Sequence, residues 1–120
     1  MSTELPPQVQ NQLAQLQQVQ QQAQMLIGQK NQVSMMLKDT EMALKELEKL
    51  DEDSIIYKSV GEILIKADKN KTLEELTEKK DMLDLRLKTL SRQEERVQNR
   101  YKQLHEQIKQ SLSMAGISAQ

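Results

Sequence analysis

Two long stretches with a heptad repeat flank a short β-rich segment, and this layout constrains the fold more than any other feature of the chain. In the second stretch, residues 73–111, apolar side chains recur in alternating steps of three and four, and Lys80, Glu94 and Ser111 occupy the remaining positions of the repeat. A sustained period of about 3.5 residues is typical of helices that supercoil around a partner. The sequence therefore predicts one helix of a coiled coil here.

The first stretch carries a similar repeat between Val9 and Leu47, but it is less regular. It needs an additional three-residue step if Leu13, Leu16 and Val19 all belong to it. The alternative for both stretches is a pair of surface helices on a globular core. Phe and Trp are absent from the 120 residues, and a narrow seam between two helices suits such a chain better than a compact core. We expect a mainly α fold, a long antiparallel two-helix coiled coil.

Local signals set the expected boundaries. Pro7 is tolerated in the first turn of a helix, and the acidic residues 51–53 are unfavourable at a helix C-terminus. Thr72 and Glu75 have the spacing of a capping box, and Gly116 suits the position after a helix. We expect a single domain, 1–120, composed of helix 7–50, hairpin 54–68, helix 72–115 and the tails 1–6 and 116–120.

Residues 8–32 are very rich in Gln. A disordered tract is the alternative interpretation. We prefer a helix, because Gln is a good helix former and the Leu and Val residues within the tract keep helical spacing. Charge is almost absent at both ends of the chain: residues 1–29 contain only Glu4, and no charged residue follows Lys109.

The segment between the helices is rich in β-branched residues and is interrupted by a glycine, which predicts two short strands joined by a turn at residues 59–62. A lone hairpin is marginally stable in water and leaves two strand edges unpaired. We therefore expect hairpins of several subunits to assemble into an inter-subunit β-barrel; the alternative is a hairpin that folds onto its own coiled coil. The expected assembly residues are Ile55, Tyr57, Gly61, Ile63 and Ile65.

Nothing in the sequence predicts catalysis, a metal site or a cofactor. The chain has no Cys, and its only histidine, His105, follows a seam position on a helix. The three glycines are scattered and form no phosphate-binding loop. The net charge of −1 does not favour nucleic acid, and no apolar run is long enough to span a membrane. We expect a cytoplasmic protein that is not an enzyme.

Three segments resemble the archaeal type of prefoldin β subunit: residues 4–13 (ELPPQVQNQL), residues 56–65 (IYKSVGEILI) and residues 92–97 (RQEERV). The order and spacing match over nearly the whole chain, and the single hairpin fits β rather than α subunits. The resemblance implies a heterohexamer of two α and four β subunits, with a β-barrel body and six coiled-coil arms. It also implies a chaperone that captures unfolded polypeptides without ATP and passes them to a group II chaperonin.

Folding back at the hairpin would bring the two charge-poor ends of the chain to one tip. We expect non-native polypeptides to bind there, to the tip residues Leu5, Val9, Leu13, Leu16, Ile108, Leu112, Met114 and Ile117. The alternative is that these residues only complete the coiled-coil seam, which we expect for part of Val9, Leu13 and Ile108 but not for Leu112 or Ile117. An alternative function is a coiled-coil scaffold or tether that docks a specific folded partner.

The same fold-back places Lys30 of the first seam opposite Glu94 of the second. We expect the two side chains to pair in a polar layer that fixes the register of the helices at some cost in stability. The alternative is that each side chain extends separately into solvent.

Overall fold

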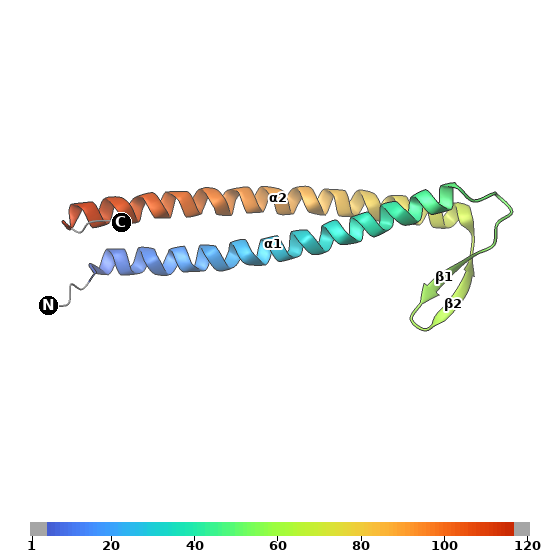
Figure 1. The fold of residues 1–120 in the computed structure, drawn as a ribbon, viewed down its shortest axis with the longest axis horizontal. Helices are drawn as coiled ribbons and strands as arrows, with labels where there is room; N and C mark the ends of the chain where they lie inside the picture. The colour runs from blue at the N-terminus through green and yellow to red at the C-terminus, as the bar shows by residue number, and fades with distance from the viewer. Residues whose placement is uncertain (1–4, 117–120) are drawn as a thin grey trace. The chain divides into compact units, whose positions relative to one another are not determined.

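A computed structural model describes residues 5–116 of the chain. The elements follow in the order α1 (Pro7–Glu48), β1 (Ile56–Val60), β2 (Ile63–Ala67) and α2 (Lys69–Met114) (Figure 1). The predicted arrangement of two long helices with a hairpin between them is confirmed. Contacts divide the chain into a first unit, residues 1–30 with 90–120, and a second unit, residues 31–89. Each unit is described by itself.

In the first unit, the N-terminal part of α1 and the C-terminal part of α2 run antiparallel. Lys30 approaches Glu94 and Gln15 approaches Arg100, so positions further from the start of α1 meet positions nearer the start of α2. The buried side chains of this unit all lie on the heptad stripes: Val9, Val19, Leu90, Leu104 and Ile108. One narrow apolar seam therefore holds the two helices together.

The seam of α1 is more regular than the sequence suggested. Gln12 is half-buried between Val9 and Leu16, whereas Leu13 is exposed. The repeat passes through Gln12 in unbroken steps of three and four, so the additional three-residue step was wrong. A polar residue in the seam has a consequence: the buried Oε1 atom of Gln12 accepts no hydrogen bond within residues 5–116. Leu13 is released to the surface instead.

In the second unit, the C-terminal part of α1 and the N-terminal part of α2 continue the same pattern. Leu83 and Thr40 are buried on their stripes. The Thr40 hydroxyl donates a 2.8 Å hydrogen bond to the backbone carbonyl of Met36 in the preceding turn. This bond satisfies a polar group inside the seam, so Thr40 is accommodated without a partner on the other helix.

The hairpin belongs to the second unit and is antiparallel, with Ile56 opposite Ala67 and Val60 opposite Ile63. Two residues, Gly61 and Glu62, connect the strands, so the turn is as short as a hairpin allows. Gly61 has a φ of 60°, and no residue other than glycine has a positive φ among the described residues. A positive φ at the first turn residue alone defines a type II′ turn, which favours glycine there.

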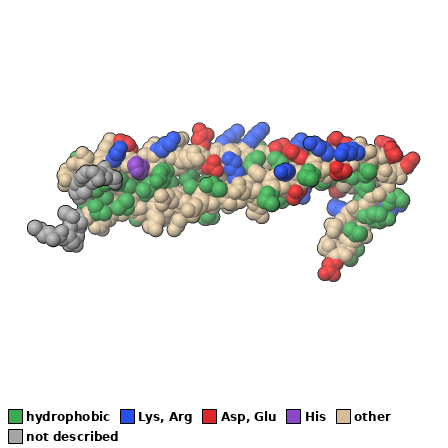
Figure 2. All heavy atoms as spheres, in the orientation of Figure 1, with side chains coloured by type: hydrophobic (Ala, Val, Ile, Leu, Met, Phe, Trp, Pro, Cys, Tyr) green, Lys and Arg blue, Asp and Glu red, His purple; other side chains and the backbone are tan. Residues whose placement is uncertain are grey.

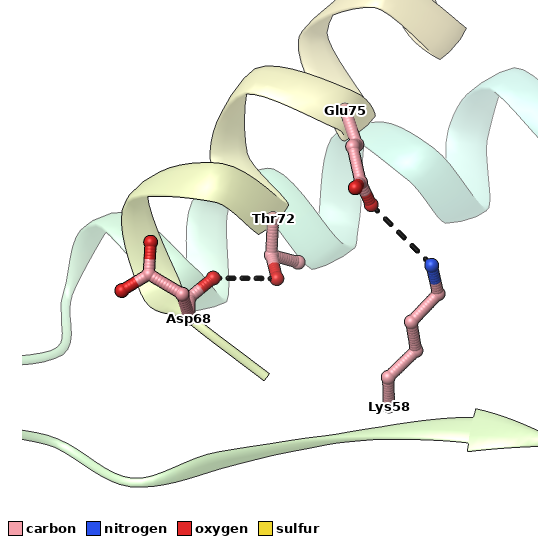
Figure 3. Close-up of polar contacts among 4 residues, drawn as sticks. All are labelled: Lys58, Asp68, Thr72 and Glu75. Atoms are coloured by element: carbon pink, nitrogen blue, oxygen red, sulfur yellow. Dashed lines mark hydrogen bonds and ion pairs between the residues drawn. The ribbon is translucent and has the colours of Figure 1, made fainter. Parts of the chain in front are cut away.

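The start of α2 differs from the prediction. The helix begins at Lys69, three residues before the expected Thr72. Its N-cap is Asp68, whose carboxylate accepts a 3.0 Å hydrogen bond from the backbone N–H of Lys71. Thr72 is already helical, and its hydroxyl donates to the Asp68 carbonyl at 2.7 Å (Figure 3). The Thr72–Glu75 capping box was therefore wrong: Asp68 caps first, and Thr72 lies one turn inside.

The other helix ends are close to expectation. α1 ends at Glu48 and is followed by a turn in which the Leu50 N–H donates to the Leu47 carbonyl. The Lys69 ammonium donates a 2.6 Å hydrogen bond to the Leu50 carbonyl, which satisfies an acceptor just beyond the helix. α2 ends before Gly116, which has a φ of 75°. Within the described residues, neither helix is long and apolar enough to cross a membrane.

Candidate functional site

The described tip residues lie in the first unit, where α1 begins and α2 ends side by side (Figure 1). The structure divides them into two groups. Val9 and Ile108 are buried in the seam, so the helices themselves use these two side chains. Leu16 and Leu112 are half-buried. The expectation that some tip residues complete the seam therefore describes Val9 and Ile108 but not Leu13, which is exposed.

The second group is available to a ligand. Leu13 is 39% exposed and Met114 is 89% exposed, and Leu5 is half-buried just before α1. Ile117 lies outside the described residues. Within residues 5–116, Leu13 and Met114 thus leave apolar surface uncovered at the end of a two-helix seam.

The surroundings of the exposed tip residues carry little charge. Residues 7–29 of α1 contain no Asp, Glu, Lys or Arg, and we call this stretch the charge-free segment. In Figure 2, the surface along this part of α1 shows no acidic or basic side chains, whereas the adjacent part of α2 carries both. An uncharged, partly apolar surface at the end of a helix pair is suited to contact with apolar side chains of another molecule.

The predicted assembly residues of the hairpin are exposed on both faces. Ile55, Tyr57, Ile63 and Ile65 are each at least 50% exposed. The neighbouring helices half-bury Ile56 and leave the others uncovered. The chain's own helices therefore do not supply the cover that these side chains need, and their place in a barrel stays a prediction.

One ion pair connects the hairpin to α2 within the second unit. The Lys58 ammonium of β1 lies 3.3 Å from a carboxylate oxygen of Glu75 (Figure 3). The two side chains are more than half exposed, so the pair contributes little stability. It does tie β1 to the first turns of α2. Glu75, which the sequence assigned to a cap, makes this contact instead.

The structure brings Lys30 and Glu94 together in the first unit. The Lys30 ammonium lies 3.5 Å from a Glu94 carboxylate oxygen, and both side chains are partly screened from solvent, with 34% and 21% of their area exposed. Whether this pair fixes the register of the helices stays a prediction.

Sequence reasoning missed two cavities on the surface of the first unit. One has a volume of about 450 Å³ and is lined by Ala23 and Tyr101; the other has a volume of about 350 Å³ and is lined by Met25 and Leu26. Val97 lines both. The available signal was Ala23, a small side chain at a seam position where larger residues predominate. Within the described residues, no cluster of His, Cys, Asp or Glu is arranged to hold a metal ion.

Comparison with known proteins assigns the chain to a family. A family model described as "Prefoldin subunit" matches residues 10–114. The prefoldin β subunit of Methanothrix thermoacetophila is 57% identical over 112 residues, which cover 93% of each chain. That of Methanococcoides burtonii is 56% identical over 116 residues, covering 97% of this chain and 99% of the relative. The chain belongs to the prefoldin subunit family.

A solved structure supports the same conclusion for the fold of this prefoldin chain. The crystal structure of the prefoldin β subunit from Thermococcus strain KS-1 superposes with a TM-score of 0.84 at 40% identity, covering 92% of this chain and 97% of that one. The single hairpin between two long helices is thus the β-type prefoldin arrangement, as the resemblance of the sequence implied.

Proposed function

We propose that this prefoldin chain is a β-type subunit of an ATP-independent chaperone that captures non-native polypeptides at the coiled-coil tip and passes them to a group II chaperonin. The observation that carries the proposal is the exposed apolar surface at the tip, formed by Leu13 and Met114 beside the charge-free segment. Non-native polypeptides expose apolar side chains, and such a surface gives them a place of contact without selecting for charge.

A single tip binds weakly in this proposal. Complete burial of one apolar side chain contributes roughly 1.5–3 kcal/mol, and ordering an unfolded client opposes that gain. Several tips around one client raise the effective concentration of the remaining sites and retain the client by multivalency. The function therefore depends on assembly, and the proposed assembly has two α and four β subunits joined through their hairpins. Its proposed location is the cytoplasm.

The test is removal of the tip from the assembled chaperone. A chain without residues 1–8 and 112–120 is co-assembled with an archaeal prefoldin α subunit, and native mass spectrometry establishes that the hexamer persists. We expect this hexamer to lose its ability to delay the aggregation of a chemically denatured test protein. Undiminished protection would contradict the proposal and place the client site elsewhere.

Point variants separate the loss of apolar contacts from the loss of helix ends. In one variant, Leu13→Gln and Met114→Gln remove exposed apolar side chains at the tip. In the matched control, Met35→Gln and Met82→Gln remove two exposed apolar side chains in the second unit. We expect the first variant to bind an unfolded protein roughly tenfold more weakly and the control to bind like the unaltered hexamer.

A further inference from the structure

The two cavities beside the seam of the first unit combine an apolar floor with a rim of amides and one cation each, Lys102 at the larger cavity and Arg96 at the smaller. Val97 lies in both floors, with Ala23 and Tyr101 on one side of the seam and Met25 and Leu26 on the other. The part of α1 that forms the rims contributes glutamines, all of them exposed: Gln20 and Gln24 at the larger cavity, Gln22 and Gln29 at the smaller.

These amides are not used to hold the chain together. Among the side-chain hydrogen bonds within residues 5–116, the glutamines of the charge-free segment contribute only through Gln10 and Gln15. Each rim glutamine therefore presents two N–H donors and a carbonyl acceptor to solvent. A peptide group has the complementary pair, one N–H and one C=O, so an amide rim can bond to a polypeptide backbone of any sequence.

The chemistry of the two cavities favours one kind of occupant. A folded protein has nearly all of its backbone groups paired, whereas an extended, non-native segment exposes them together with its apolar side chains. The charge-free segment of α1 adds no charge to either rim, and the single cations at the rims, Lys102 and Arg96, come from α2 and can donate to backbone carbonyls as well. A second folded protein would gain little from the amide rim, because its own backbone groups are already satisfied.

We infer that the two cavities form a second client site, in which an extended non-native polypeptide places apolar side chains against Val97 and its backbone against the glutamine rims. The inference rests on the proposed function but names a different surface. The rims lie at residues 20–29, about two to four helical turns along α1 from the exposed tip residue Leu13. A client held at the tip therefore meets this site next along the same helix.

The test replaces the rim amides without reducing apolar surface. A variant with Gln20→Ala, Gln22→Ala, Gln24→Ala and Gln29→Ala keeps strong helix formers on α1. The matched control changes four other exposed glutamines of α1 to Ala, namely Gln17, Gln18, Gln21 and Gln32. Both are co-assembled with an α subunit, verified by mass and circular dichroism, and titrated with reduced, carboxymethylated α-lactalbumin, which is permanently unfolded.

We expect the rim variant to bind this probe about tenfold more weakly and the control to stay within about twofold of the unaltered hexamer. Unchanged or tighter binding by the rim variant would overturn the inference, because apolar contact alone would then account for affinity. Equal weakening of both variants would overturn it too, since the effect would not be local to the cavities. If the unaltered hexamer failed to bind the probe, both the proposed function and this inference would be contradicted. If the unaltered hexamer bound the probe and the rim variant bound it equally well, only this inference would be contradicted, and the proposal for the tip would remain.

Discussion

The seam of the first unit and the hairpin of the second are both rich in aliphatic residues, but the seam buries these side chains and the hairpin leaves them exposed. Leu104 in the seam is fully buried, whereas Ile63 in β2 is 65% exposed. A helix with a heptad repeat gathers its apolar side chains on one narrow stripe, and a single partner helix covers that stripe. The chain provides this partner itself.

A two-stranded hairpin cannot be covered by one partner element in the same way. Successive side chains of a strand point to opposite faces, so Ile63 and Leu64 cannot be covered by one neighbour. Each strand also pairs along one edge only, because β1 and β2 form a two-stranded sheet. Folding and assembly are therefore expected to depend on separate elements: the seam stabilises the chain, and we expect the hairpin to be covered by other chains.

The largest expected effect follows from changing the hairpin alone. Replacing Ile63 and Ile65 together with Asp should abolish the hexamer and leave helical subunits, because charged side chains would then occupy one of the hairpin faces expected to pack between subunits. Native mass spectrometry of the variant mixed with an α subunit measures the assembly, and circular dichroism measures the helices.

The matched control carries Met35→Asp and Met82→Asp, which place the same charges at exposed apolar positions on the helices. We expect this control to assemble normally. A hexamer of unchanged mass with the hairpin variant would show that assembly depends on some other surface.

The next effect concerns the seam. Leu104→Ala removes a fully buried side chain and should lower the free energy of unfolding of the chain by about 2–5 kcal/mol. Leu85→Ala on the same helix removes a side chain that is 66% exposed and should change it by no more than about 0.5 kcal/mol. Urea unfolding followed by circular dichroism measures both. Similar losses for the two variants would mean that Leu85 is covered in solution, and the stripe would no longer explain stability.

Much of the fold was predictable because it depends on patterns that are local or periodic. The heptad stripes predicted the helices, and the β-branched run around Gly61 predicted the hairpin. The repeat in α1 was misread at Gln12, because an apolar neighbour, Leu13, competed for the same position. Only the burial of Gln12 shows that continuity of the repeat outweighs the polarity of one residue.

The remaining differences between prediction and structure arise where neighbouring residues could fill the same structural role. Asp68 and Thr72 are both good N-cap residues, and the carboxylate of Asp68 takes the role because its hydrogen bond to Lys71 begins the helix one turn earlier. The tip was predicted as a group, but which of its members are buried depends on the helix phase, which places Val9 inside and Leu13 outside. The cavities beside Val97 depend on the packed volumes of several side chains and have no sequence motif.

The smallest effect tests whether the seam contains a register device. Because the side chains of Lys30 and Glu94 remain partly exposed, their pair should contribute no more than about 1 kcal/mol in a double-mutant cycle with Lys30→Met and Glu94→Gln, and less at high salt. Replacing both with Leu should stabilise the chain, since two apolar residues fill a seam layer better than a partly exposed ion pair.

We expect the Leu–Leu variant to lose specificity for one register of the two helices. The chain has no native Cys, so introduced cysteine pairs can report the register. Gln24 and Gln98 line one cavity, and a disulfide between Gln24→Cys and Gln98→Cys reports the native register. A disulfide between Gln24→Cys and Ser91→Cys reports a shift by one heptad. We expect the unaltered seam to form only the first disulfide and the Leu–Leu variant to form both. Formation of the first disulfide alone in both backgrounds would show that the apolar stripe fixes the register without Lys30 and Glu94.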